Sequence, residues 1–411
     1  MEKLLKKYGR LIVSTGVHLK KDQLLVINAP IACADFARII AREAYKVGAR
    51  DVVIQWNDEL FSKLRFEMAE DVVFQDVPNW RKSFYIDYAR EDAAFVSILS
   101  SDPEIFKTID PSRLSMAQQA NAKALKEYRE RLMSNKNAWC VVSIPTNAWA
   151  AKVFPEVSEE EAMELLWKAI FSAVRIDADS DPVENWEQHL LYLERARVFM
   201  NTHRFTKLHY KNSLGTDLWI ELPEDHIWAS GAEEVNGSWR FVANMPTEEV
   251  YTLPKAHGVN GTVYSTKPLN YNGVLIEDMV LTFKDGEVVS FEAKKGKEML
   301  RQLLSTDAGS CRLGEVALVP KDSPISKSGI LFYNTLFDEN ASCHLAFGKA
   351  YPTCLTNGAD MSEEELEAAD VNESLIHEDF MIGSDDLSIY GIDREGKETE
   401  IFSQGNFVIF S

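Results

Sequence analysis

Residues 24–56 read LLVINAPIACADFARIIAREAYKVGARDVVIQW, and this stretch decides the fold class. An apolar run over residues 24–28 ends at Pro30, which is typical of a buried strand. Residues 35–45 carry apolar side chains at helical spacing, and Gly48 ends that predicted helix. A second strand follows at residues 51–56. The order strand, helix, strand predicts a βαβ unit with parallel strands.

The same rhythm continues on the C-terminal side of this stretch. Residues 93–99 and 139–144 are predicted strands, and the pair Asp110-Pro111 predicts the start of a helix that runs to about residue 133. Further helices are expected up to residue 174 and over residues 182–201. Residues 1–185 are therefore predicted to form an N-terminal α/β domain, with a mostly parallel sheet flanked by helices.

Beyond residue 185 the pattern changes to short alternating runs separated by turn residues. Residues 281–283 and 288–291 flank Lys284-Asp285-Gly286-Glu287, which predicts a β-hairpin. Residues 394–397 mark a second turn of the same kind. We therefore expect residues 186–411 to form a C-terminal α+β domain rich in antiparallel strands.

Composition excludes several classes of protein. The chain of 411 residues has 44 basic and 64 acidic side chains, a net charge of −20 that disfavours nucleic acid as a partner. It contains no apolar run of the ~18 residues that a membrane span needs. Its five cysteines form no Cys-x-x-Cys pair, and the first residues are charged rather than signal-like, so a cytoplasmic protein with reduced thiols is expected.

Short catalytic motifs such as His-Glu-x-x-His, Gly-x-Ser-x-Gly and the P-loop are absent from the sequence, so candidate residues must be found from their context. His377 and Asp379 are two apart, and in an extended segment both face one side while Glu378 faces the other. Imidazole and carboxylate together are common ligands of divalent metals. The alternative is a polar turn before a strand at residues 380–382.

Three further positions carry groups of the same kind. If residues 341–351 are helical, His344 and Tyr351 lie two turns apart on one face; the alternative is a buried polar pair. Glu315 begins a strongly apolar strand, where a half-buried carboxylate needs a partner, either a metal or a salt bridge. In Glu248-Glu249, alternation lets only one carboxylate reach a shared centre.

These residues stand within four blocks that resemble a known family. The blocks are NMPTEEVYTLP at 244–254, LGEVALVP at 313–320, DENASCHLAFGKAY at 338–351 and HEDFMIGS at 377–384. In this order they resemble the thermophilic aminopeptidase family of metallopeptidases, of the AmpS/PepS type. The resemblance covers the whole chain. It implies a hydrolase that removes N-terminal residues from peptides with a free N-terminus, and a homodimer.

The resemblance also implies a site with two divalent ions, Zn²⁺, Co²⁺ or Mn²⁺, and a catalytic tyrosine, Tyr351. The implied metal ligands are Glu249, Glu315, His344, His377 and Asp379. Spacing to Glu315 favours Glu249 over Glu248. Three carboxylates and two divalent ions leave a net charge of about +1, which one hydroxide neutralises. The general base stays unassigned; Glu248 is a candidate, and a surface salt bridge is its alternative.

Two other functions compete with exopeptidase chemistry. One is a two-metal hydrolase of another amide or ester. The other is a binding protein with a single structural metal, which is disfavoured because structural zinc sites are usually rich in cysteine and closed to solvent.

Overall fold

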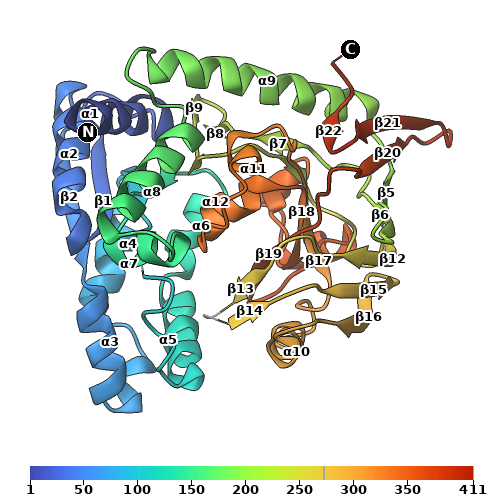
Figure 1. Cartoon of the computed structure of the whole chain (residues 1–411), viewed down its shortest axis with the longest axis horizontal. Helices are drawn as coiled ribbons and strands as arrows, with labels where there is room; N and C mark the ends of the chain where they lie inside the picture. Colours follow the sequence, from blue (N-terminus) through green and yellow to red (C-terminus); the bar gives the residue numbers. More distant parts are fainter. Residues whose placement is uncertain (101, 272–273, 411) are drawn as a thin grey trace. The chain divides into compact units, whose positions relative to one another are not determined.

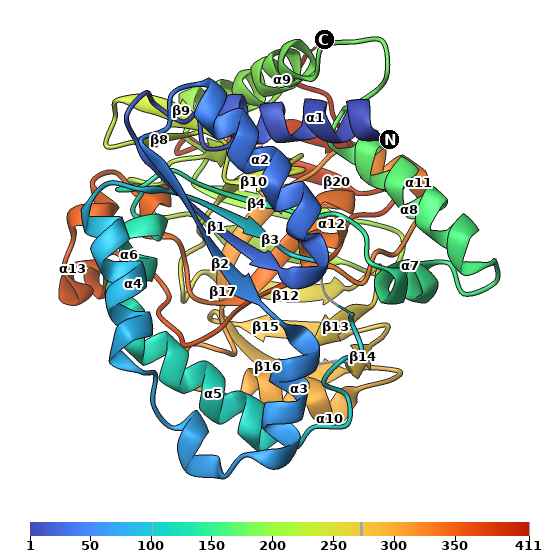
Figure 2. The same cartoon turned by 90° about the vertical axis from the view of Figure 1, so that its left-hand side faces the viewer.

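The computed structural model describes residues 1–100, 102–271 and 274–410 (Figures 1 and 2). The chain forms two compact units. The first comprises Met1–His189 and Ala232–Pro246, and the second comprises Leu190–Gly231 and Thr247–Ser411. Residues 232–246 thus belong to the first unit, although they follow the boundary predicted near residue 185.

The first unit contains the predicted parallel sheet. Its five strands lie in the order β10-β4-β3-β1-β2, and every neighbouring pair is parallel. The strands are β1 (Leu24–Pro30), β2 (Asp51–Asn57), β3 (Ala94–Ile98), β4 (Trp139–Val142) and β10 (Asn244–Met245). The opening stretch therefore forms the predicted βαβ unit, with β1 and β2 in register from Leu24 and Asp51 onward.

Helices flank this sheet (Figure 2). The helices that lie wholly within this unit are α1 (Glu2–Leu11), α2 (Ala34–Lys46), α3 (Glu59–Met68), α4 (Asn79–Arg90), α5 (Pro111–Ala124), α6 (Lys126–Met133), α7 (Asn147–Val153) and α8 (Glu159–Ala173). Helix α2 buries Phe36, Ala37, Ile40 and Ala44, the apolar stripe that predicted it. Helix α9 (Pro182–His203) runs from the first unit into the second.

The prediction of a single helix over residues 110–133 is wrong in one respect. The helix is interrupted at Leu125, which separates α5 from α6. Helix α5 buries none of its side chains. Leu125, Tyr128 and Leu132 instead pack against a core cluster that includes Tyr85 and Phe95. Leu125 lies at the break and the other two lie in α6, and their spacing of three and four residues places them in one partly buried stripe that faces the core.

The second unit is built on two antiparallel sheets. The eight-stranded sheet has the order β16-β15-β12-β6-β5-β20-β21-β22, and the five-stranded sheet has the order β19-β18-β17-β11-β7. The strands of the larger sheet are β5 (Lys207–Lys211), β6 (Asp217–Glu221), β12 (Val259–Tyr264), β15 (Val280–Lys284), β16 (Glu287–Glu292), β20 (Ser388–Ile392), β21 (Glu398–Ser403) and β22 (Asn406–Phe407). Those of the smaller sheet are β7 (Ala229–Ser230), β11 (Val250–Thr252), β17 (Leu313–Leu318), β18 (His344–Gly348) and β19 (His377–Met381). The antiparallel second part is thereby confirmed.

Both predicted hairpins are present. Strands β15 and β16 pair across Asp285 and Gly286, whose φ angles are 49° and 83°, as a two-residue hairpin turn requires. Strands β20 and β21 pair across residues 393–397. Short elements complete the chain: β8 (Glu233–Val235) and β9 (Trp239–Phe241), β13 (Leu269–Tyr271) and β14 (Val274–Ile276), and helices α10 (Lys297–Leu304), α11 (Pro324–Ser328), α12 (Thr335–Asp338) and α13 (Glu363–Ala368).

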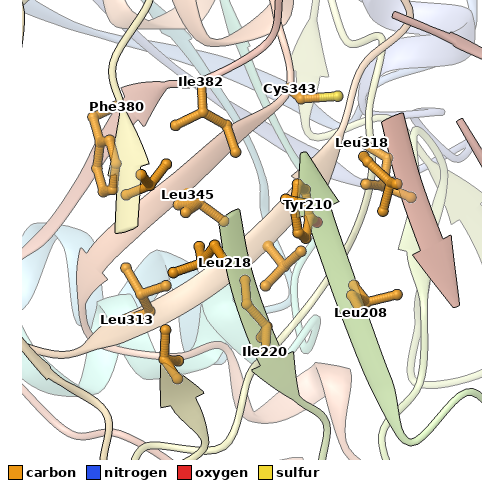
Figure 3. Close-up of a cluster of buried hydrophobic side chains, with 14 of the residues drawn as sticks. Leu208, Tyr210, Leu218, Ile220, Leu313, Leu318, Cys343, Leu345, Phe380 and Ile382 are labelled. Carbon is orange, nitrogen blue, oxygen red and sulfur yellow. The ribbon is translucent and has the colours of Figure 1, made fainter. Parts of the chain in front are cut away.

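The core of the second unit lies between its two sheets (Figure 3). Leu208, Tyr210, Leu218 and Ile220 come from β5 and β6, and they meet side chains from β17, β18 and the end of β19, such as Leu318, Leu345 and Phe380. One face of the five-stranded sheet therefore packs against the core. Among the described residues, no helix combines the length and hydrophobicity needed to span a bilayer.

Candidate metal centre

The candidate ligands lie on the face of the five-stranded sheet that is turned away from this core. Val316, Leu345 and Phe380 belong to the core cluster. Because successive strand residues point to opposite faces, Glu315 on β17, His344 on β18 and Asp379 on β19 point to the other face.

Strand register brings these side chains together across the sheet. Ala346 on β18 lies opposite Glu315 on one side and Asp379 on the other. The only side-chain atom of Ala346 is a methyl carbon, so the space above it is left to the two flanking carboxylates. On the same face Gly348 lies opposite His377, and His344 lies opposite Met381. The middle strand therefore contributes one imidazole and two small residues between the strands that carry Glu315 and Asp379.

The ligand atoms form two groups of three residues each. Glu249, Glu315 and His344 form one group, and Glu315, His377 and Asp379 form the other; within each, the potential ligand atoms lie within 4.8 Å of one another. Glu315 belongs to both groups. Its Oε1 is 3.4 Å from Nε2 of His344, and its Oε2 is 3.5 Å from Nε2 of His377. The two oxygens of one carboxylate thus face two different histidines.

The remaining distances complete the two groups. Oε2 of Glu249 is 3.2 Å from Nε2 of His344. Oδ1 of Asp379 is 3.7 Å from Nε2 of His377 and 4.0 Å from Nε2 of His344. All five predicted ligands are therefore brought together, and the structure distinguishes Glu249 from Glu248, which belongs to neither group.

Hydrogen bonds on the far side of each imidazole fix which nitrogen faces the carboxylates. Nδ1 of His344 donates to the carbonyl oxygen of Ser342 at 3.1 Å, and Nδ1 of His377 donates to that of Lys349 at 2.7 Å. In a neutral imidazole each Nε2 then presents a lone pair to the carboxylate oxygens. The lone pair and the negatively charged oxygens would repel each other unless a cation lay between them. Backbone carbonyls that accept the distal N–H are the usual support of metal-binding histidines.

The burial of the ligand side chains also favours a bound positive charge. His344 is fully buried, and Glu249, Glu315 and Asp379 are 8%, 4% and 7% exposed, so the prediction that Glu315 is half-buried is wrong. Burial raises the pKa of Glu315. Burial alone would lower the pKa of His344, but the nearby Glu249 and Glu315 carboxylates raise it well above its ordinary value. Nε2 of His344 and Oδ1 of Asp379 are buried without a hydrogen-bond partner among the described groups. The donor set therefore fits divalent cations.

Segment 377–379 is extended, as predicted, and the polar-turn alternative is wrong. His377 is 22% exposed, which makes it the most accessible of the five candidate ligands. Glu378 is half-buried on the opposite face, where burial and the Asp379 carboxylate raise its pKa to about 8.

The helix predicted over residues 341–351 is wrong. Residues His344–Gly348 form β18, because Leu345 and Phe347 alternate into the core, and Gly348 ends the strand with a φ of +92°. Tyr351 then precedes a short 3-10 helix, Pro352–Cys354. Its ring nevertheless reaches the centre, with its centroid 4.7 Å from that of His377. Burial, followed by the carboxylates of Glu315 and Asp379, raises the pKa of Tyr351 well above its ordinary value, so the phenol keeps its proton.

One acidic residue near the centre was missed by the sequence analysis. Burial, followed by Asp379 and Glu249, raises the pKa of Glu339 well above its ordinary value, so this carboxyl group lies in the field of the ligand carboxylates. Its neighbour Asn340 accepts a hydrogen bond from the backbone N–H of Glu248 at 2.7 Å. Glu339 lies within the 338–351 block, but an acidic residue in a polar run gives no distinctive pattern.

Comparison with known proteins agrees with the metal site that the geometry indicates. The family Peptidase_M29, thermophilic metalloprotease (M29), matches residues 1–407. The chain belongs to this family. It is 48% identical to "Aminopeptidase 2" of Geobacillus stearothermophilus, over 99% of this chain and 98% of that protein. It is also 48% identical to "Aminopeptidase AmpS" of Bacillus subtilis (strain 168), over 98% of each protein. The prediction of a hydrolase of the metallopeptidase class is confirmed, and the family implies a divalent metal.

Solved structures agree on the fold. Wild-type AmpT from Thermus thermophilus superposes with a TM-score of 0.93 at 38% identity, covering 99% of this chain and 100% of that one. A 2,5-dihydroxypyridine dioxygenase from Pseudomonas putida KT2440 superposes with a TM-score of 0.54 at 11% identity, covering 99% and 97%. At that identity the second likeness concerns the fold alone, and function has to be argued from the site.

Proposed function

We propose that this M29 family member is an aminopeptidase that hydrolyses the N-terminal peptide bond of peptides at a centre of two divalent ions. The observation that carries the proposal is the pair of three-residue groups sharing Glu315, since two sets of nitrogen and oxygen donors would suit two divalent ions. The relatives are named as aminopeptidases, which supports peptides as the substrate class.

In this proposal each candidate residue has one task. Glu249 and His344 would hold one ion and His377 and Asp379 the other, and Glu315, which belongs to both groups, would contribute to both. The backbone carbonyls of Ser342 and Lys349 keep the imidazoles in the tautomer that ligation needs. Zn²⁺, Co²⁺ and Mn²⁺ all accept this donor set. The chemistry gained from such ions is a water of lowered pKa and a polarised scissile carbonyl.

Tyr351 donates a hydrogen bond to the oxygen of the scissile carbonyl as negative charge develops on it. Support comes from its position beside His377 and from the raised pKa, which keeps the phenol protonated over the neutral range. A donor aimed at the developing charge acts mainly in the transition state.

A carboxyl group beside the centre favours a substrate with a free N-terminus. Three ligand carboxylates and two divalent ions leave about one positive charge, and Glu339 adds a further carboxylate close to them. Bound cations would offset the ligand carboxylates that raise the pKa of Glu339. An ionised Glu339 would then cancel the remaining positive charge and offer an anionic partner for the substrate's α-ammonium group. An N-acetylated peptide lacks this cation and should bind poorly.

The deciding experiment compares free and blocked substrates. Purified protein, loaded with each of the three metals in turn, is assayed with alanine and leucine p-nitroanilides and with their N-acetyl derivatives. Hydrolysis restricted to the free amines is expected. Equal hydrolysis of the blocked compounds would favour a two-metal hydrolase of other amides or esters, and an inactive protein that retains a single ion would favour a structural site. His377→Ala, purified in the same way, controls for contaminating peptidases.

Two further parts of the proposal concern the setting of the enzyme. It works in the cytoplasm on peptides, and it does so as a homodimer. Light scattering after size-exclusion chromatography should give twice the mass of the 411-residue chain. A monomer that is fully active in dilute solution would contradict the dimer.

A further inference from the structure

A small cavity borders the candidate metal centre within the second unit. Its volume is about 30 Å³, and Asp379 and Met381 of β19 form part of its wall. Asp379 and Met381 are two residues apart on one strand, so they point to the same face of the sheet, about 7 Å apart along it. The cavity therefore shares its wall with the ligand cluster.

The remaining wall combines apolar side chains with polar ones, among them Asn270, Asn334 and Thr335. Leu269 of β13, Leu275 of β14 and Leu331, from the loop before α12, line it together with Met381. Leu269 and Met381 are buried, whereas Leu275 and Leu331 are half-buried. Strands β13 and β14 pair at Leu269 and Ile276, so one pair of short strands supplies two of the apolar lining residues.

The polar edge of the cavity carries no basic group. Among the described residues that line it there is no lysine, arginine or histidine. Asp338 is present, but its Oδ1 accepts the backbone N–H of Phe332 at 2.7 Å and its Oδ2 accepts that of Asn334 at 3.0 Å. These two hydrogen bonds engage both oxygens of Asp338, so the carboxyl group is not a free partner for an incoming basic side chain, and an acidic side chain finds no counter-ion in the wall.

We propose that this cavity is the subsite for the side chain of the substrate's N-terminal residue, and that it selects small to medium uncharged aliphatic side chains. The inference rests on the proposed aminopeptidase function, because only then is the group nearest the scissile carbonyl the side chain of a terminal residue. That side chain branches from the carbon bonded to the scissile carbonyl, so its subsite must adjoin the metal ligands, as the wall at Asp379 does.

Size sets the order of preference. A volume of about 30 Å³ is small, about two to three times the ~10–15 Å³ that a cavity needs to hold one water molecule. A methyl or isopropyl group enters with small movements of the half-buried Leu275 and Leu331. A phenyl ring requires a larger displacement of the wall. An acidic side chain finds no basic group there, and a basic one meets only Asp379, a candidate metal ligand, and Asp338, whose oxygens already accept backbone N–H groups.

The test reshapes the cavity in two directions without touching a ligand. Leu331→Ala enlarges it and Leu275→Phe fills it, while Leu214→Ala, a half-exposed leucine elsewhere in the second unit, serves as the matched control. The full chain, loaded with metal, is assayed for kcat/KM on alanine, leucine and phenylalanine p-nitroanilides. We expect Leu331→Ala to raise the ratio of phenylalanine to alanine by about tenfold or more. We expect Leu275→Phe to lower the ratio of leucine to alanine by about as much, and the control to leave both ratios within about twofold.

Binding of free L-alanine, L-leucine and L-phenylalanine, followed as shifts in Tm and by calorimetry, gives a readout that is independent of turnover, and the same order is expected. If both cavity variants are folded and metallated but keep the wild-type ratios and binding order, the subsite is overturned while aminopeptidase activity stands. If wild-type protein cleaves no free-amine substrate, the proposed function fails and this inference fails with it.

Discussion

Replacing Tyr351 with Phe separates a catalytic phenol from one that only packs. The phenylalanine keeps the ring, and with it the contacts to His377 and to Tyr251, whose centroid is 6.2 Å away. Only the hydroxyl is lost. Among the described residues the Tyr351 hydroxyl takes part in no hydrogen bond with the protein, so the fold should lose well under ~1 kcal/mol.

The expected loss of activity is much larger. A donor that meets the charge developing on the scissile carbonyl oxygen typically contributes ~3–4 kcal/mol to the transition state, which corresponds to a fall in kcat of ~100-fold to ~1,000-fold. Because the donor acts little in the ground state, KM should change little. Metal content should not change, since Tyr351 belongs to neither ligand group.

The assay combines steady-state kinetics on leucine p-nitroanilide with metal analysis and thermal unfolding of the same samples. Tyr390→Phe, a half-buried tyrosine on β20, is the matched control and should keep normal kcat. A Tyr351→Phe enzyme with its full complement of ions and a near-normal kcat would remove the phenol from the mechanism. A proportional loss of metal and activity would instead make it a support of the ligands.

Three other perturbations test the site and the fold. Chelation should abolish activity and lower Tm, because ions that bind only the folded state stabilise it, and added Zn²⁺, Co²⁺ or Mn²⁺ should restore both; activity in metal-free protein would refute the centre. His377→Ala and Asp379→Ala should each lose metal and activity, whereas Glu378→Ala, on the opposite face, should retain both. Metal analysis and steady-state kinetics on the same samples measure the two losses. Hydrogen bonds from the Ser213 and Ser384 side chains and the Ser213 backbone lower the pKa of Asp386 to about 2. The stability these bonds give is present above pH ~4 and lost as pH falls towards 2, so the Tm deficit of Asp386→Ala should shrink over that range; a constant deficit would contradict this.

Much of the fold could be predicted because its signals are local. The βαβ unit over residues 24–56 follows from an apolar run, a helical stripe and a glycine stop, and the Asp285-Gly286 turn follows from the need for positive φ. Strand β10 could not be predicted, since a strand of two residues has no period. Its pairing with β4 depends on a contact between residues about 100 positions apart.

The site was predictable to the extent that it follows strand alternation. The spacing of two residues between His377 and Asp379 predicts that both side chains lie on one face of a strand. Residues 344–348 do not, because HLAFG is a short apolar run that fits either a strand or a buried helix, and only tertiary pairing with β17 and β19 decides between them. Glu339 carries no pattern at all, and only its electrostatic proximity to Asp379 and Glu249 reveals it.

The five-stranded sheet explains why so much negative charge can be buried in one place. Its core face, with Val316, Leu345 and Phe380, supplies the apolar burial that keeps the strands together. The opposite face then carries carboxylates whose burial opposes folding unless cations compensate them. Ala346 leaves the room in which such cations can be bound between Glu315 and Asp379. Removing the ions should consequently weaken the sheet at β17–β19 before it weakens β5 and β6, which contact the same core from the other side. Hydrogen exchange of apo protein should therefore show faster exchange in β17–β19, and uniform exchange across both sheets would mean that the core alone sets their stability.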